Sequence, residues 1–153
     1  MMIGIIMSYF ASLSFAFLFN LNKKTAFLTA FGGSIGWAFY TIGLDLWGDQ
    51  PVAYFCGALA LTFYSEIMAR IMKTPVTSYV TPALIPLVPG GGLYQTMLKS
   101  LSGDYNGAVN EGINTLMYSG ALAIGILVVF TLIKTYYSLR TSSIASNNID
   151  KYV

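Results

Sequence analysis

The chain has 153 residues, of which 56% are hydrophobic and only 9% are charged. Soluble domains carry about 25% charged residues, so a soluble protein of this size would have too few charges to cover its surface. The composition excludes an ordinary soluble domain and predicts an integral membrane protein.

Side-chain chemistry narrows the function further. The chain has no histidine, and its one cysteine, Cys56, lies in an apolar run, so neither a disulfide framework nor a Cys-based zinc site can form. The sequence contains no nucleophile–base set and no phosphate loop of the G-x-x-x-x-G-K-[ST] type. We therefore expect no enzyme, no catalytic residue, no metal or other cofactor, and no nucleic-acid partner.

Five segments are long and apolar enough to cross a bilayer core of about 30 Å as helices of about 20 residues. In chain order they are 2–20, 25–44, 52–71, 79–99 and 113–133, and the longest polar stretch between them is SGDYNGAVNEG at 102–112. The first segment lacks a basic n-region and a clear cleavage site, which favours a helix over a signal peptide. We predict an all-α integral membrane protein with a transmembrane module over 1–140 and a polar tail over 141–153.

The charges predict an orientation. Asp45 and Asp49 lie in the second connection, whereas basic residues gather in the first and third connections and after the fifth segment. If all five segments span, seven of the eight basic residues fall on one side: Lys23, Lys24, Arg70, Lys73, Lys134, Arg140 and Lys151. By the positive-inside rule, the N-terminus is outside and the C-terminus is cytoplasmic.

Small residues follow helical spacing on two segments. Gly4, Ser8, Ser12 and Ala16 share one face of the first, and the second contains the sequence GGSIG at 32–36. Such faces allow close approach of helices in lipid. They predict packing either within the protomer or against another subunit.

The fourth segment contains IPLVPGGG at 85–92, the worst helix formers in the chain. Pro86 and Pro89 remove two backbone donors, and Gly90, Gly91 and Gly92 permit backbone angles closed to other residues. We predict two half-helices, about 79–85 and 92–100, joined by an unwound link near the middle of the membrane. Freed carbonyls there could bind an ammonium group, and the N–H groups of the second half-helix could bind a carboxylate. The alternative is a kinked helix whose freed groups are satisfied by neighbours.

Other polar residues of the segments have two interpretations each. Glu66 could carry protons, as intramembrane carboxylates often do, or could simply pair with Arg70 four residues later. Ser34, Thr81 and Tyr94 could line a polar path or could hydrogen-bond between helices.

Two stretches resemble the small membrane subunit of the split threonine/serine exporters: FAFLFNLNKKTAFLTAFGGSIGW at 15–37 and TPALIPLVPGGGLYQTML at 81–98. The resemblance covers about residues 9–133, and the P-x-x-P-G block is its most specific part. The matching motif positions are Gly33, Ser34, Gly36, Pro86, Pro89, Gly90, Tyr94 and Met97.

The resemblance implies a multi-pass subunit of the bacterial cytoplasmic (inner) membrane that exports L-threonine and L-serine, driven by the proton-motive force. It also implies a larger partner subunit, and some split relatives are assigned to dicarboxylate export. We expect the unwound link to bind or gate the substrate, with Glu66 as the candidate for proton coupling. Two rivals stay open, a dicarboxylate (succinate) exporter subunit and a non-transporting assembly or scaffold subunit; a homo-oligomer is also possible.

Overall fold

The chain is built from helices, which confirms the predicted all-α membrane fold. The computed structural model describes residues 2–149, with side chains described as far as residue 139. The elements are α1 (Met2–Leu18), α2 (Lys23–Trp47), α3 (Gln50–Met72), α4 (Thr77–Leu84), a short 3₁₀ turn η1 (Ile85–Leu87), α5 (Gly90–Leu101) and α6 (Tyr105–Ile149).

Three of the described helices are long and apolar enough to cross a bilayer: α2, α3 and, within α6, Tyr105–Leu139. Helix α1 is apolar but shorter, with 17 residues. The predicted fourth segment is divided between α4, with 8 residues, and α5, with 12, so neither part alone has spanning length. The predicted number of five spans and the predicted orientation stay predictions.

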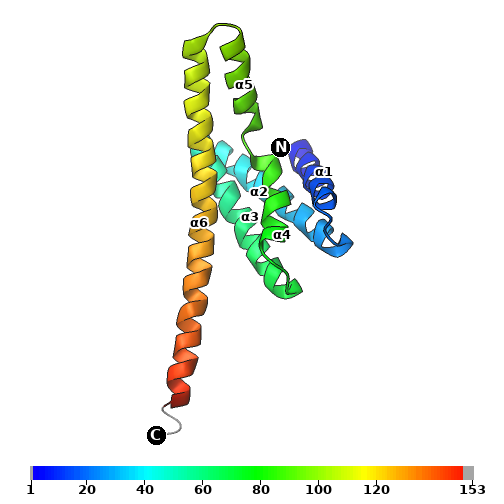
Figure 1. The fold of residues 1–153 in the computed structure, drawn as a ribbon, viewed down its shortest axis with the longest axis vertical. Helices are drawn as coiled ribbons and strands as arrows, with labels where there is room; N and C mark the ends of the chain where they lie inside the picture. The colour runs from blue at the N-terminus through cyan, green and yellow to red at the C-terminus, as the bar shows by residue number, and fades with distance from the viewer. Residues whose placement is uncertain (1, 150–153) are drawn as a thin grey trace.

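Helix α2 is the centre of a bundle, in which it packs against α1, α3 and α4, while α3 also packs against α6. Helix α5 contacts no element but α6 among the described residues. Figure 1 shows the result: α5 and the first part of α6 form a hairpin that projects beyond the bundle, and α6 continues down its side.

The bundle is packed largely through small side chains, and many of its large apolar side chains point outward. Ser8, Ser12 and Ala16 of α1 are buried, as are Gly32, Gly33 and Gly36 of α2, so the predicted small faces pack within the chain. Phenylalanines of α1 and α2 are about half exposed: Phe10, Phe17, Phe27, Phe31 and Phe39. This arrangement suits a lipid surround, in which close packing and not apolar burial holds helices together.

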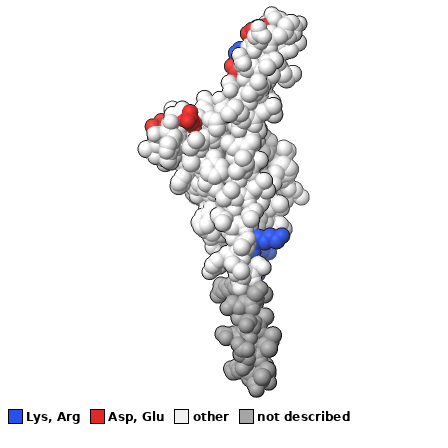
Figure 2. Space-filling model, turned by 90° about the vertical axis from the view of Figure 1, so that its left-hand side faces the viewer, with Lys and Arg blue, Asp and Glu red and all other residues white. Residues whose placement is uncertain are grey.

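The charges lie at different levels of the molecule. Asp45 and Asp49 flank the turn between α2 and α3, and Arg70 and Lys73 lie at the other end of α3. Helix α3 has 23 residues, or about 34 Å, which exceeds the thickness of a bilayer core. In Figure 2, acidic and basic atoms lie together at the upper tip, whereas the acidic atoms on the left and the basic atoms at the lower right are separated by an uncharged zone.

The polar stretch at 102–112 is not the connection that its composition predicts, because α6 begins inside it. Gly103 turns the chain with a φ of 83°. The Asp104 side chain then accepts a hydrogen bond from the Gly107 amide at 2.9 Å. This bond satisfies one of the free amides at the start of a helix, so α6 forms despite the local glycines.

The predicted boundary between the transmembrane module and the polar tail, at residue 140, falls within a helix. Helix α6 continues through that position to Ile149, so residues 141–149 of the predicted polar tail prolong the last helix. Residues 150–153 of the predicted tail lie outside the described residues.

Candidate functional site

The predicted break in the fourth segment is confirmed. Helix α4 ends at Leu84, and the 3₁₀ turn is closed by a hydrogen bond from the Val88 amide to the Ile85 carbonyl at 3.2 Å. Val88 is extended, with φ −60° and ψ 131°. Pro86 and Pro89 cannot donate backbone hydrogen bonds, so the helical ladder cannot continue through the link.

The three glycines behave differently from the prediction. They form the first turn of α5 and do not adopt left-handed angles, since the described glycines with positive φ are Gly48 and Gly103. The Leu93 amide closes this turn on the Pro89 carbonyl at 3.4 Å. The unwound link is therefore shorter than predicted, and the glycines supply space instead of unusual backbone angles.

Space opens at the start of α5. A Cβ atom built on Gly90 or Gly91 would meet no atom of the described residues within 4 Å, and both glycines are exposed. The first amides of a helix have no partner within the helix and carry partial positive charge. The Gly90 amide already donates to the Val88 carbonyl at 2.7 Å. The amides of Gly91 and Gly92 have no backbone acceptor across the link among the described residues, so they are the N–H donors that a carboxylate could approach.

Leu87 fastens the link to the bundle. Its side chain is buried at 1% exposure in the core cluster, and its Cδ2 atom lies 2.8 Å from where a Cβ of Gly57 would be. The same position lies 2.9 Å from the Gly36 carbonyl oxygen and 3.2 Å from the Tyr40 Cβ. Only a residue without a side chain fits between α2, α3 and the link. Gly57 therefore provides the space in which Leu87 of the link packs.

This contact also sets the depth of the link. Gly57 is seven residues after Gln50 and fifteen before Met72, which correspond to about 10 Å and about 22 Å of helix. The link therefore lies about a third of the way along α3 from the acidic end of the bundle.

A row of aromatic rings lies beside the link. The Trp37 ring is 5.4 Å from that of Tyr40, which is 4.7 Å from that of Tyr54, which stacks on Tyr118 at 5.2 Å. The row thereby joins α2, α3 and α6. Trp37 also borders a small cavity with Pro86 and Gly4, of about 190 Å³.

Sequence patterns do not reveal this surrounding. Trp37 and Tyr40 are three residues apart, as are Tyr54 and Gly57, but these two pairs and Tyr118 are distant from one another in the sequence and fall in no short motif. Apolar periodicity predicts that the rings serve packing. Nothing in the sequence marks Gly57 as the helical glycine that contacts the link, and only its neighbours in the structure show this.

Two of the predicted polar residues lie away from the open end of α5. The Ser34 hydroxyl donates to carbonyls of Ile5 and Ala30, both at 3.3 Å, so it fixes α1 on α2. Thr81 is exposed on α4, in a hollow with Phe19 and Leu21. The structure brings neither of them into the predicted path through the link.

Tyr94 and Glu66 are also separated. Tyr94 is 62% exposed on α5, one turn after the open glycines. Glu66 is buried near the other end of α3, where its carboxylate is 3.0 Å from the Arg70 guanidinium. The guanidinium in turn lies over the Tyr137 ring, 3.8 Å from its centre. Glu66 is nine residues beyond Gly57, or about 14 Å along α3, so it does not touch the link.

Hydroxyl groups fill part of the bundle interior. The Thr29 hydroxyl donates to the Ser78 carbonyl at 3.4 Å, a carbonyl whose helical donor is missing because Pro82 follows four residues later. Ser12 Oγ and Thr62 Oγ1 are buried and find no hydrogen-bond partner among the described residues. Within the part of the chain that the structure describes, no three His, Cys, Asp or Glu side chains are grouped as metal ligands would be.

Replacing Gly92 by alanine is expected to destabilise the α5–α6 hairpin. The new Cβ would clash with the Thr115 hydroxyl and lie 3.2 Å from its Cβ, and such overpacking costs about 1–3 kcal/mol. Thr115→Ala in the same chain should restore most of the loss, measured by thermal unfolding of the purified proteins. Gly112→Ala is the matched control, since its nearest neighbour, Thr96, would lie at 3.5 Å. An equal loss in that control would contradict this account of the interface.

Comparison with known proteins finds a family for the chain. The family model described as threonine/serine exporter, ThrE, matches residues 4–132, which include every helix of the bundle and the link. No curated protein and no solved structure matches the chain.

Proposed function

Because the chain belongs to the threonine/serine exporter family, we propose that it is the membrane subunit of a secondary exporter of L-threonine and L-serine. In this proposal the proton-motive force drives export, the chain lies in the bacterial inner membrane, and a larger partner subunit completes the transporter. Family membership itself makes the chain a transporter-type membrane protein with an amino-acid substrate class.

The observation that carries the proposal is the open start of α5 beside a broken helix. An α-amino acid bears a carboxylate and an ammonium group at once. The amides at Gly91 and Gly92 suit the carboxylate, because a helix N-terminus binds anions. The aromatic row beside the link suits the ammonium, because aromatic faces attract cations. Broken helices that offer both kinds of group recur in secondary transporters.

The charges near the link favour an amino acid over a dicarboxylate. A dianion would call for basic side chains, and Lys99 is the basic residue of α5. Its ammonium lies 2.8 Å from the Glu111 carboxylate, so its charge is already matched. A zwitterionic substrate needs no such residue.

The exposed face of α5 supports a partner subunit. Leu93, Tyr94, Met97 and Leu101 are between 55% and 86% exposed, and α6 is the described element on which α5 packs. This hairpin surface is where we expect the larger subunit to bind. The same feature is what a purely scaffolding subunit would need, so transport has to be measured directly.

The test is efflux from cells preloaded with a threonine-containing dipeptide. Cells would carry this chain with its presumed larger subunit, either chain alone, or neither. Threonine efflux that requires both chains is the expected result. Succinate efflux without threonine efflux would replace the substrate, and no movement of either would favour the scaffold.

We further propose that Glu66 couples transport to protons. Glu66→Gln keeps a hydrogen-bonding group opposite Arg70 but cannot ionise, so threonine efflux should no longer respond to an imposed proton gradient. The control is Glu111→Gln, which removes a carboxylate paired with a lysine at 2.8 Å elsewhere in the chain. If Glu66→Gln responds to the gradient as the unmodified chain does, Glu66 serves only its pair with Arg70.

A further inference from the structure

One end of the molecule carries a basic pocket between two helices. Arg70 and Lys73 end α3, and Lys134 lies alongside on α6; all three are exposed. Glu66 is the carboxylate at this end of α3, and it is paired with Arg70. Lys73 and Lys134 do not line the pocket itself, but Lys73 follows its lining residue Arg70 by three positions and Lys134 directly follows its lining residue Ile133. Neither lysine forms an ion pair among the residues whose side chains are described.

The pocket has a volume of about 430 Å³ and is formed by the last turns of α3 and the facing side of α6. Arg70 lies at its mouth, with one side of the guanidinium toward Glu66 and its face over Tyr137. These contacts hold the arginine in place while 41% of its side chain stays exposed. Because Glu66 matches the charge of Arg70, the guanidinium would contribute fixed hydrogen-bond donors to a phosphate group, and Lys73 and Lys134 would contribute the net positive charge.

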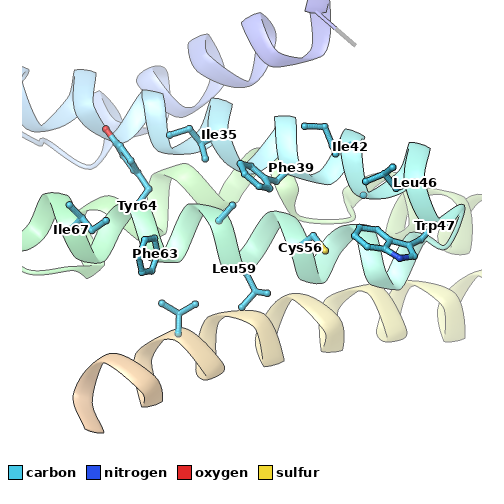
Figure 3. A pocket seen from close by; sticks show the side chains of 13 residues that line it. Ile35, Phe39, Ile42, Leu46, Trp47, Cys56, Leu59, Phe63, Tyr64 and Ile67 are labelled. Carbon is cyan, nitrogen blue, oxygen red and sulfur yellow. The ribbon is translucent and has the colours of Figure 1, made fainter. Parts of the chain in front are cut away.

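An apolar groove continues from this pocket along the bundle. It has a volume of about 740 Å³, with α3 as its floor between α2 and α6, and it shares Phe63 and Ile67 with the basic pocket. Figure 3 shows Phe39, Ile42 and Leu46 of α2 along one side and Leu59 and Phe63 of α3 below them. From Ile67 to Cys56 the groove runs eleven residues, about 16 Å, which is roughly the depth of one leaflet.

We propose that the pocket and groove together bind one anionic phospholipid. Its phosphate lies at Arg70, Lys73 and Lys134, and an acyl chain lies in the groove between α2 and α6. Basic pockets between transmembrane helices are known to bind anionic lipid headgroups. The charge at one end and the apolar length beyond it match the two parts of such a lipid.

The lining of the groove favours an acyl chain over a helix of another protein. Large side chains such as Phe39, Phe63 and Ile67 dominate it, and it offers almost no hydrogen-bonding groups. Helices that associate in lipid meet through small residues and interhelical hydrogen bonds. A flexible chain can fill the irregular space between large side chains.

The test is binding of 1-palmitoyl-2-oleoyl phosphatidylglycerol to the purified full-length chain, measured by native mass spectrometry against the matching phosphatidylethanolamine. Phosphatidylglycerol should bind more tightly. The double variant Lys73→Asn, Lys134→Gln leaves the Glu66–Arg70 pair intact, and asparagine tolerates the positive φ of 52° at residue 73. It should weaken phosphatidylglycerol binding about 20- to 30-fold, at about fivefold for each basic residue.

Two controls show whether the lipid uses both the basic pocket and the groove. Lys99→Gln removes a lysine of the distant hairpin and should change nothing, whereas Ala60→Phe fills the groove and should weaken both lipids. Equal binding of the two lipids, or no effect of the double variant, would overturn the proposal.

The groove itself is tested in membranes with a phosphatidylglycerol that carries a photoreactive diazirine in its acyl chain. Labelling should concentrate on α3 and on α6 around Val129. Uniform labelling that includes the outer face of α1 would overturn the proposal. So would an unlabelled groove whose Cys56 cross-links to another protein helix. Neither experiment depends on whether the chain exports threonine.

Discussion

Threonine export is expected to fall about 10- to 100-fold when Gly91 is replaced by leucine. The new side chain would keep the substrate carboxylate away from the amides of α5, and the range is that expected for losing one charge-assisted hydrogen bond. The fold itself should tolerate the change. Gly91 is helical, its φ is not positive, and its Cβ would meet no atom of the described residues within 4 Å. A loss of export would therefore indicate that the start of α5 must stay open to the substrate during transport.

The matched control is Gly120→Leu. Gly120 is also exposed and helical, and a Cβ there would likewise meet nothing in the described chain within 4 Å. Efflux assays on both variants, at equal amounts of membrane-inserted protein, make the comparison. Gly90→Leu should behave as Gly91→Leu does. Unchanged export in both α5 variants would remove the open end of α5 from the mechanism.

A second large effect is expected at Gly57, but on folding. Gly57→Ala would place a Cβ 2.9 Å from the Gly36 carbonyl oxygen and 2.8 Å from Leu87. A backbone atom cannot move without its helix, so α2 and α3 must separate. We expect a loss at the upper end of the usual cost of overpacking, about 3 kcal/mol. Thermal unfolding in detergent measures it.

Combining Gly57→Ala with Leu87→Ala sharpens this test. The second change removes the flexible neighbour but leaves the Gly36 carbonyl in place, so it should not rescue the first. Full rescue would mean that the link alone, and not the contact between α2 and α3, requires the glycine. The two outcomes therefore show whether Gly57 is required by the packing of Leu87 or by the close contact between α2 and α3.

Sequence patterns predict the fold class and the break for simple physical reasons. Few charges and long apolar segments leave only membrane helices, and two prolines three residues apart must interrupt a helix. The small faces of α1 and α2 are predictable as well, because helical spacing fixes which residues share a side.

The site is less predictable because it depends on contacts between distant segments. The prediction that Gly90–Gly92 use backbone angles closed to other residues is wrong, because a glycine can supply space as well as backbone freedom and the sequence does not distinguish the two. Their predicted part in binding or gating the substrate stays a prediction. Polarity alone leaves open whether Thr81 and Ser34 line a path or hydrogen-bond between helices, and only the packing of α1, α2 and α4 decides where they point. The start of α6 escapes prediction because one capping contact from Asp104 outweighs a polar composition.

The uninterrupted helix α6 connects the hairpin with the end of the molecule that holds the Arg70–Glu66 pair. Gly125 packs closely against α3: a Cβ atom built on it would lie 2.8 Å from the Ala58 Cβ and 3.0 Å from the Phe55 carbonyl oxygen. Thr115, which holds the open end of α5, lies ten residues to one side, about 15 Å. Tyr137, which covers Arg70, lies twelve residues to the other, about 18 Å. Because α6 is one continuous helix, a tilt of the hairpin would also move Tyr137 relative to the Arg70–Glu66 pair.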